Sequence, residues 1–280
     1  MLYLFGAVKR QNKEIASKGS ALRLIHEISA IIRQDTSFNE MLEKSINCIC
    51  LETGWPVGHA YLPSTENADE LVASNIWHQA NNLNLTEFKK ITSKTIFQKG
   101  VGLPGRIWET QQPVWISDVS KDDNFQRAQQ CKILQLHSAT GFAIFIDDQI
   151  LAVMEFFTNK KLKKDSKLLQ TFSTLSTQLE QAWKKNLIKQ KIEKSEEQNR
   201  MLLQSAGEVI FGIDPEGKAT FVNPAATQML GYTEERLIRQ PIHPLIHHSH
   251  SDGRPYPEED CPIYSKAHEG KTHETVNEVL

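Results

Sequence analysis

The densest group of side chains able to do chemistry is a run of histidines near the C-terminal end of the sequence. The group comprises His243, His247, His248, His250, Asp252, Cys261, His268 and His273. Imidazole, carboxylate and thiolate groups are ligands for transition metals, and four of them can close a tetrahedral zinc site. Their spacing matches no zinc finger. The competing interpretation is a polar loop in which Cys261 packs at a helix start.

A second candidate is the pattern Gly-x-Gly-x-x-Gly at residues 100–105, which matches a dinucleotide-binding fingerprint. A Rossmann site needs a strand before this pattern and an acidic residue about 20 positions after it. Here residues 88–97 predict a helix, and Pro104 begins the next one. We therefore expect a tight turn that positions Arg106 and Trp108. It is no Walker loop, because no Gly-Lys-Ser/Thr follows.

Other catalytic patterns are incomplete. His26 and Glu27 match the beginning of a histidine kinase phosphoacceptor box, but the Arg-Thr-Pro that completes the box is absent. The histidines and cysteines also lack the flanking glycines of a nucleophile elbow. The sequence therefore predicts no catalytic centre within these residues.

The composition is that of a globular protein with more than one domain. A chain of 280 residues favours two domains, and 39% hydrophobic with 24% charged residues is ordinary for a soluble protein. A net charge of -2 gives no overall attraction to nucleic acid or to an anionic membrane. Four cysteines are too few for a disulfide scaffold and favour the cytoplasm.

The first 20 residues are expected to be a lead-in. Their apolar start, residues 1–8, is far shorter than the roughly 20 residues of a membrane span. Lys9 and Arg10 follow the apolar run, whereas a signal peptide carries its positive charge before it. We expect a cytoplasmic protein that does not span the membrane.

Residues 21–164 predict one α+β domain. Apolar spacing predicts two helices over 21–52, with a break at residues 35–37, where Asp, Thr and Ser are good helix caps. Predicted strands cover 59–62, 71–78, 113–119, 141–146 and 150–158, the last two forming a hairpin, and predicted helices cover 86–97 and 124–134.

Residues 165–202 predict a long connecting helix. Apolar positions alternate in steps of four and three, which is typical of a coiled coil. They fall at Leu168, Phe172, Leu175, Leu179 and Ala182 and, after a phase slip at 183–187, at Ile188, Ile192, Ser195, Asn199 and Leu202. This pattern predicts a homodimer with a stutter in its seam. The alternative is an amphipathic helix that packs on its own domain.

Residues 203–280 predict a second, smaller domain. It consists of a hairpin (209–214 and 219–223), helices at 224–230 and 233–240, a polar loop at 243–260, a helix at 261–269 and a strand at 273–280.

Several motifs in order resemble known families. Residues 21–183 resemble a GAF domain in the segments 52–55 (Glu-Thr-Gly-Trp), 100–108, 113–118, 124–128 and 155–157. Residues 199–280 resemble a PAS domain in the segments 205–208, 212–214, 221–226, 229–235, 247–253 and 260–264. The resemblance implies two antiparallel-sheet sensory domains, of fold class α+β, joined by the long helix.

The resemblance also implies where ligands would bind. In the GAF-like domain it implies a small-molecule pocket, for which we select Trp77, Arg106, Trp108, Trp115, Phe142 and Phe156. In the PAS-like domain the candidates for metal or haem binding are His243, His247, His248, His250 and Cys261. No cofactor is favoured: zinc is an alternative from the residue types, and haem is an alternative from the resemblance. A bilin is not expected, because Cys131 is followed by Lys132 instead of histidine, and a flavin motif is absent.

The implied function is sensory input. A ligand or partner would change one domain, and the helix would pass the change to an output. The PAS-like segment also lacks two strands that the family uses to close its sheet, which predicts a C-terminally incomplete domain or a covered edge. The alternatives are a metal- or haem-binding sensor, or the N-terminal part of a histidine kinase or a diguanylate cyclase.

Overall fold

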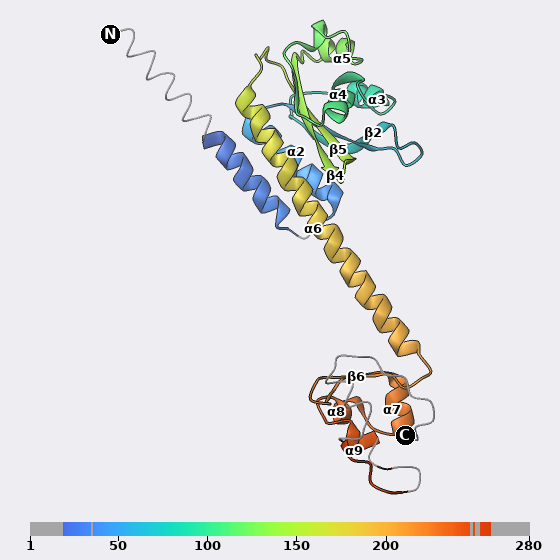
Figure 1. Cartoon of the computed structure of the whole chain (residues 1–280). Helices are drawn as coiled ribbons and strands as arrows, with labels where there is room; N and C mark the ends of the chain where they lie inside the picture. Colours follow the sequence, from blue (N-terminus) through green and yellow to red (C-terminus); the bar gives the residue numbers. More distant parts are fainter. Residues whose placement is uncertain (1–18, 35, 247–248, 250–252, 259–280) are drawn as a thin grey trace, which may run out of the picture. The chain divides into compact units, whose positions relative to one another are not determined.

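The computed structural model describes residues 19–34, 36–246, 249 and 253–258. The chain divides into two compact units, residues 1–187 and 188–280 (Figure 1). The helix α6, Ser166–Ser205, begins in the first unit and ends in the second.

A five-stranded antiparallel sheet forms the centre of the first unit. Its strands are β1 (Val57–Pro63), β2 (Leu71–Gln79), β3 (Val114–Ile116), β4 (Ser138–Ile146) and β5 (Gln149–Thr158). Their order is β2-β1-β5-β4-β3, so β5 is the central strand. The hairpin β4–β5 turns at Asp147 and Asp148, both with positive φ, as a two-residue turn of type I′ requires.

Helices cover both faces of this sheet (Figure 1). The α2/α6 face carries the helix at residues 19–32, α2 (Phe38–Thr53) and the first half of α6. The α3–α5 face carries α3 (Thr86–Thr92), α4 (Gly102–Thr110), the 3-10 turn η1 (Val119–Lys121) and α5 (Ala128–Ile133).

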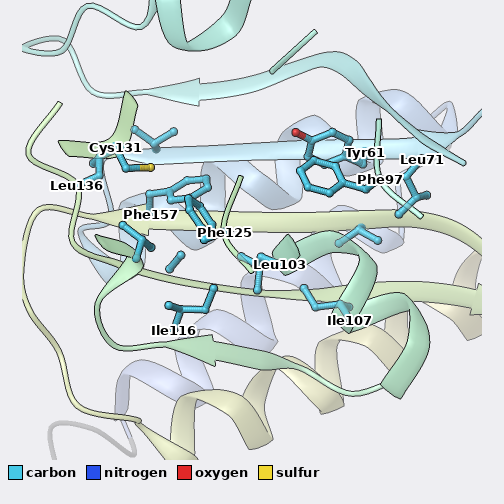
Figure 2. Packing of buried hydrophobic residues seen from close by; sticks show 14 of the residues in the cluster. Tyr61, Leu71, Phe97, Leu103, Ile107, Ile116, Phe125, Cys131, Leu136 and Phe157 are labelled. Carbon is cyan, nitrogen blue, oxygen red and sulfur yellow. The ribbon is translucent and has the colours of Figure 1, made fainter. Parts of the chain in front are cut away.

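Because side chains alternate along a strand, each strand supplies both faces. Met154 and Phe156 of β5 pack on the α2/α6 face with Phe172 of α6, while Val153 and Phe157 pack on the α3–α5 face. Figure 2 shows the second of these clusters, in which rings of Tyr61, Phe97, Phe125 and Phe157 interleave with aliphatic side chains.

The predicted break between the first helices has a clear cause. Ser37 accepts a hydrogen bond from the Glu40 amide, and the Glu40 carboxylate accepts one from the Ser37 amide, forming a capping box at the start of α2. At the other end Gly54 adopts the left-handed conformation that ends helices.

The second unit contains β6 (Phe211–Ile213), β7 (Ala219–Val222), α7 (Pro224–Leu230), α8 (Glu234–Leu237) and α9 (His243–Ile246). Its core consists of small and aliphatic side chains: Ala219, Val222, Ala226, Leu237, Ile242 and Ile246. The predicted helix at 261–269 and strand at 273–280 lie outside the described residues.

Several short elements differ from the sequence-based prediction. The helix expected at 86–97 ends at Thr92, because Phe97 exchanges both backbone hydrogen bonds with Leu71 of β2. The helix expected at 124–134 is shorter, since α5 begins only at Ala128. The helix expected at 233–240 is limited to α8, and α9 lies within the segment expected to be loop.

The two halves of the predicted α6 seam have different surroundings. Phe172, Leu175 and Leu179 are buried on the sheet of the first unit. In residues 188–202, by contrast, every side chain is exposed. The apolar repeat therefore serves the domain's own core in its first half.

Candidate functional site

A buried ionic cluster lies at the middle of the α3–α5 face. Glu155 is on the central strand β5, directly opposite His59 of β1. Arg127, the residue before α5, donates to the Glu155 carboxylate through both terminal nitrogens, at 2.8 and 2.6 Å. His59 Nδ1 lies 3.3 Å from Glu155 Oε1. All three side chains are at most 1% exposed.

Aromatic rings enclose the guanidinium of Arg127. Its central carbon lies 5.3–5.6 Å from the centroids of five rings, those of Tyr61, Phe88, Phe97, Phe125 and Phe157. A cation at this distance from a ring face is attracted to its negative π-surface, and the attraction is larger where water is excluded. The site is therefore a carboxylate with aromatic walls around one planar cation.

The charges in this cluster stabilise one another. Burial by itself raises the pKa of Glu155, but the Arg127 guanidinium and the hydrogen bond with His59 outweigh it, so the pKa lies below its ordinary value. Burial by itself lowers the pKa of Arg127, and the Glu155 carboxylate reverses this effect. We therefore assign a charged Arg127–Glu155 pair.

His59 completes the cluster on the strand side. Burial lowers its pKa, although the hydrogen bond with Glu155 opposes the shift. Its Nε2 lies 3.1 Å from the carbonyl oxygen of Ser74, and its ring stacks on Trp77 with centroids 3.8 Å apart. A neutral His59 has one N–H to share between two oxygen acceptors.

The six predicted pocket residues are divided between the two faces of the sheet. Trp77 and Trp108 pack with the α3–α5 cluster, whereas Trp115, Phe142 and Phe156 belong to the α2/α6 cluster. Trp115 forms an edge-to-face pair with Trp55, and both line a cleft of about 290 Å³ beside the start of α6. The set therefore does not line one common cavity.

Arg106, the sixth residue, stabilises the glycine-rich turn. Its Nη1 lies 3.0 Å from Asp122, and its Nε donates to the carbonyl oxygen of Gly102. Asn124 accepts from the Gly102 amide and donates to the Gly100 carbonyl. Gly100 and Gly102 both have positive φ. The turn thus joins α4 to the segment that carries Arg127.

Sequence reasoning missed the residues of the buried cluster. Glu155 is the only charged residue in the buried stretch 152–158 of β5, and such an isolated charge in an apolar strand signals a buried partner. Both residues lie within segments already noted for their family resemblance, Arg127 in 124–128 and Glu155 in 155–157, but neither was selected as a site residue. Their pairing has no local signal, because they are 28 residues apart.

Cys131 is fully buried beside this cluster, and burial raises the pKa of its thiol to about 12. A thiol in this state is protonated at neutral pH and unreactive.

A groove of about 910 Å³ lies in the second unit, between the end of α6 and the elements β7 and α7. Leu203, Phe221 and Tyr232 give it an apolar lining, while Glu196 and Arg200 of α6 lie along it.

Asn223 joins the end of α6 to the core of this unit and is fully buried. Its side-chain oxygen accepts from the amides of Ile210 and Ala226, capping α7. Its side-chain nitrogen donates to the carbonyl oxygens of Leu203 and Glu208.

The predicted histidine site is only partly within the described residues. His243 Nε2 lies 2.9 Å from the carbonyl oxygen of Tyr256, while His247, His248, His250 and Cys261 lie outside those residues. In the described part of the chain, no three His, Cys, Asp or Glu side chains are arranged to hold a metal ion. Zinc or haem binding stays a prediction, which metal analysis and a visible absorption spectrum test.

No helix among the described residues combines the length and the apolar character needed to cross a membrane.

Family models match both parts of the chain. Residues 35–184 match the GAF domain, and residues 197–274 match the PAS fold. The chain therefore belongs to the GAF domain family and carries a PAS fold after its GAF domain. No curated protein matches the sequence.

Solved structures with a similar fold include several GAF domains. The GAF domain of a phosphoenolpyruvate-protein phosphotransferase from Coxiella burnetii is 15% identical, with a TM-score of 0.49, covering 61% of this chain and 96% of its own. The free methionine-R-sulfoxide reductase of Neisseria meningitidis, in complex with its substrate, is 17% identical, with a TM-score of 0.48 and coverages of 59% and 88%. The A. aeolicus nlh2 GAF domain in an inactive state is 17% identical, with a TM-score of 0.46 and coverages of 61% and 99%. Identities this low carry no information about ligand or activity.

Proposed function

We propose that this chain is the sensory input module of a cytoplasmic signal-transduction protein, in which α6 pairs with a second copy and relays a change to an output. GAF and PAS domains together support a signalling sensor. In this proposal the output is a separate domain or a partner protein. A histidine kinase and a diguanylate cyclase are the two alternatives for it.

The exposed half of α6 carries the proposal. Over residues 188–202, all side chains are exposed, yet Ile188, Ile192 and Leu202 are apolar and 51%, 53% and 68% exposed. They fall on positions a and d of a heptad repeat, together with Ser195 and Asn199. An isolated helix with this seam gains stability by covering it.

The charges beside the seam favour a parallel pair. In a parallel, in-register coiled coil, position g of one helix faces position e of the next heptad in the other. This places Lys191 of one copy opposite Glu196 of the other. Asn199 then faces its own counterpart at an a position, where asparagine specifies register.

The helix is attached firmly inside each unit. In the first unit the hydroxyl of Ser176 donates to the carbonyl oxygen of Ala143 of β4, and Trp183 packs on Phe38. In the second unit the carbonyl oxygen of Leu203 accepts from Asn223. A rotation of α6 would therefore act on both cores, and the phase slip at 183–187 is the proposed place where two packings exchange.

Disulfide trapping of the full chain tests this proposal. Ile188→Cys and Leu202→Cys should each form a disulfide-linked dimer under mild oxidation, because a parallel pair places each residue beside its own counterpart. Gln190→Cys, on the opposite side of the helix, is the matched control, and the wild type reports any reaction of the native cysteines. Absence of dimer in light scattering, or equal trapping of all three variants, would refute the paired helix.

A further inference from the structure

The surroundings of Arg127 have the composition of a receptor site. The Glu155 carboxylate receives the guanidinium in a two-pronged arrangement, and aromatic rings face the cation around it. Planar cations are recognised in this way, by a carboxylate that matches the guanidinium fork and by ring faces. Here the chain itself supplies the cation.

Most of the enclosing groups do not depend on the segment that carries Arg127. Glu155, Tyr61 and Phe157 stand on the central strands, and Phe88 and Phe97 belong to α3 and the segment after it. Of the five rings, only Phe125 comes from the same segment as Arg127. Removing the Arg127 side chain therefore leaves the carboxylate and four rings in place.

The guanidinium is also incompletely paired. Its two terminal nitrogens contact Glu155 and Thr92, but among the described residues its buried Nε has no hydrogen-bond partner. A buried ion pair is in general no more stabilising than apolar packing of the same volume, so stability alone does not account for this arrangement.

We propose that the Glu155 carboxylate and its aromatic walls form a binding site for a guanidinium-type organic cation, and that Arg127 is its tethered occupant. This inference rests on the proposed sensory function and names the ligand class for the GAF domain. A free cation and the Arg127 side chain would compete for Glu155. Because Arg127 is tethered to the chain, its guanidinium has a high effective concentration at Glu155. A free cation therefore needs a higher concentration to displace it.

Chemical rescue of Arg127→Ala tests the site. Ethylguanidinium has the atoms of the arginine side chain beyond Cβ, and ethylurea is its neutral analogue of similar shape. The readout is thermal unfolding followed by tryptophan fluorescence. All five tryptophans, Trp55, Trp77, Trp108, Trp115 and Trp183, lie in the first unit, so the signal reports that unit within the full chain.

We expect ethylguanidinium at about ten times its dissociation constant to raise the Tm of Arg127→Ala by about 3–6 °C. Ethylurea should not raise it, and the wild type should respond more weakly because its site is filled. Arg106→Ala removes the same charge from the partly exposed pair with Asp122 and should show no rescue. The double variant Arg127→Ala with Glu155→Gln should also lose the response.

Equal effects of ethylguanidinium and ethylurea, or an equal response of Arg106→Ala, would overturn the proposal. If Arg127→Ala is unfolded alone, recovery of its native fluorescence by ethylguanidinium becomes the readout, and failure to recover overturns the proposal equally. Chemical rescue and disulfide trapping test the two proposals separately. Failure of rescue with normal dimer trapping refutes the cation site alone. Rescue without dimer trapping refutes the paired helix alone.

Discussion

At the scale of single residues, Glu155 and Arg127 form the part of the GAF domain in which charge and core packing meet. The pair lies wholly inside the α3–α5 cluster, so neither charge is screened by water. Removing one partner of such a pair leaves an uncompensated charge, which costs more than the pair contributes.

Arg127→Met should therefore destabilise the first unit by about 3–5 kcal/mol. The double variant Arg127→Met with Glu155→Met should recover much of this loss, because both charges are then absent. Urea unfolding followed by tryptophan fluorescence measures both values. If the loss in the double variant equals the sum of the losses in Arg127→Met and Glu155→Met, the two residues are not coupled.

His59 should make the stability of the first unit depend on pH. Its pKa in the folded protein is below the value of about 6.5 in the unfolded chain, so the unfolded chain binds more protons as pH falls through that value. The contribution of neutral His59 to the free energy of unfolding is therefore fully present above about pH 7 and decreases towards about pH 5.5. Glu155, with its lowered pKa, adds a further loss only below about pH 4.5.

His59→Gln, which keeps a donor for Glu155 but does not titrate, should flatten the profile between pH 7 and pH 5.5. His78→Gln is the comparison variant. Burial lowers the pKa of His78 as well, but that residue is only half-buried, so its replacement should flatten the profile less. Denaturation midpoints at each pH measure the effect. A slope in His59→Gln equal to that of the wild type would contradict the assignment.

At the scale of elements, Asn223 connects three segments of the second unit: the end of α6, the strand β6 region and α7. Its side-chain amide provides both an oxygen acceptor and an N–H donor group, so one residue satisfies backbone groups of all three segments. The side-chain hydrogen bonds of Asn223 thus link the end of the connecting helix to the hairpin.

Asn223→Ala should destabilise the second unit by about 2–4 kcal/mol, because it removes a helix cap and leaves buried backbone groups unpaired. Hydrogen exchange of the amides in residues 209–230 measures this change. Thr227→Ala, in the same helix, should change stability by less than about 0.5 kcal/mol. Tryptophan fluorescence should be unaffected in both variants, since every tryptophan is in the first unit.

At the scale of the whole molecule, the proposed relay depends on the rotational phase of α6. Inserting seven residues after Glu193 keeps the heptad phase, whereas inserting two rotates the following residues by roughly 200°. Leu202→Cys should therefore still form its disulfide with the longer insertion and lose it with the shorter one. In the proposed relay, the response of the output should follow the same pattern, and an output indifferent to phase would exclude a rotational relay.

Much of the architecture could be predicted from local patterns. The helix break at Ser37, the hairpin at Asp147–Asp148 and the long helix after Asp165 all depend on residues close in sequence: a capping box, a two-residue turn and the absence of Gly or Pro. Shorter helices were predicted too long. The end of α3 is set by the pairing of Phe97 with Leu71, a contact between distant segments.

The sequence by itself determined the order of the domains, the family of each and the helix that joins them, because these follow from periodicity and from short motifs. Only the tertiary structure decided which half of the α6 seam is covered by its own sheet. A repeat of apolar residues looks the same whether the helix packs on its own domain or on a second helix. It likewise decided that Arg127 reaches Glu155. A buried charge signals that a partner exists, but only the path of the chain through space selects it.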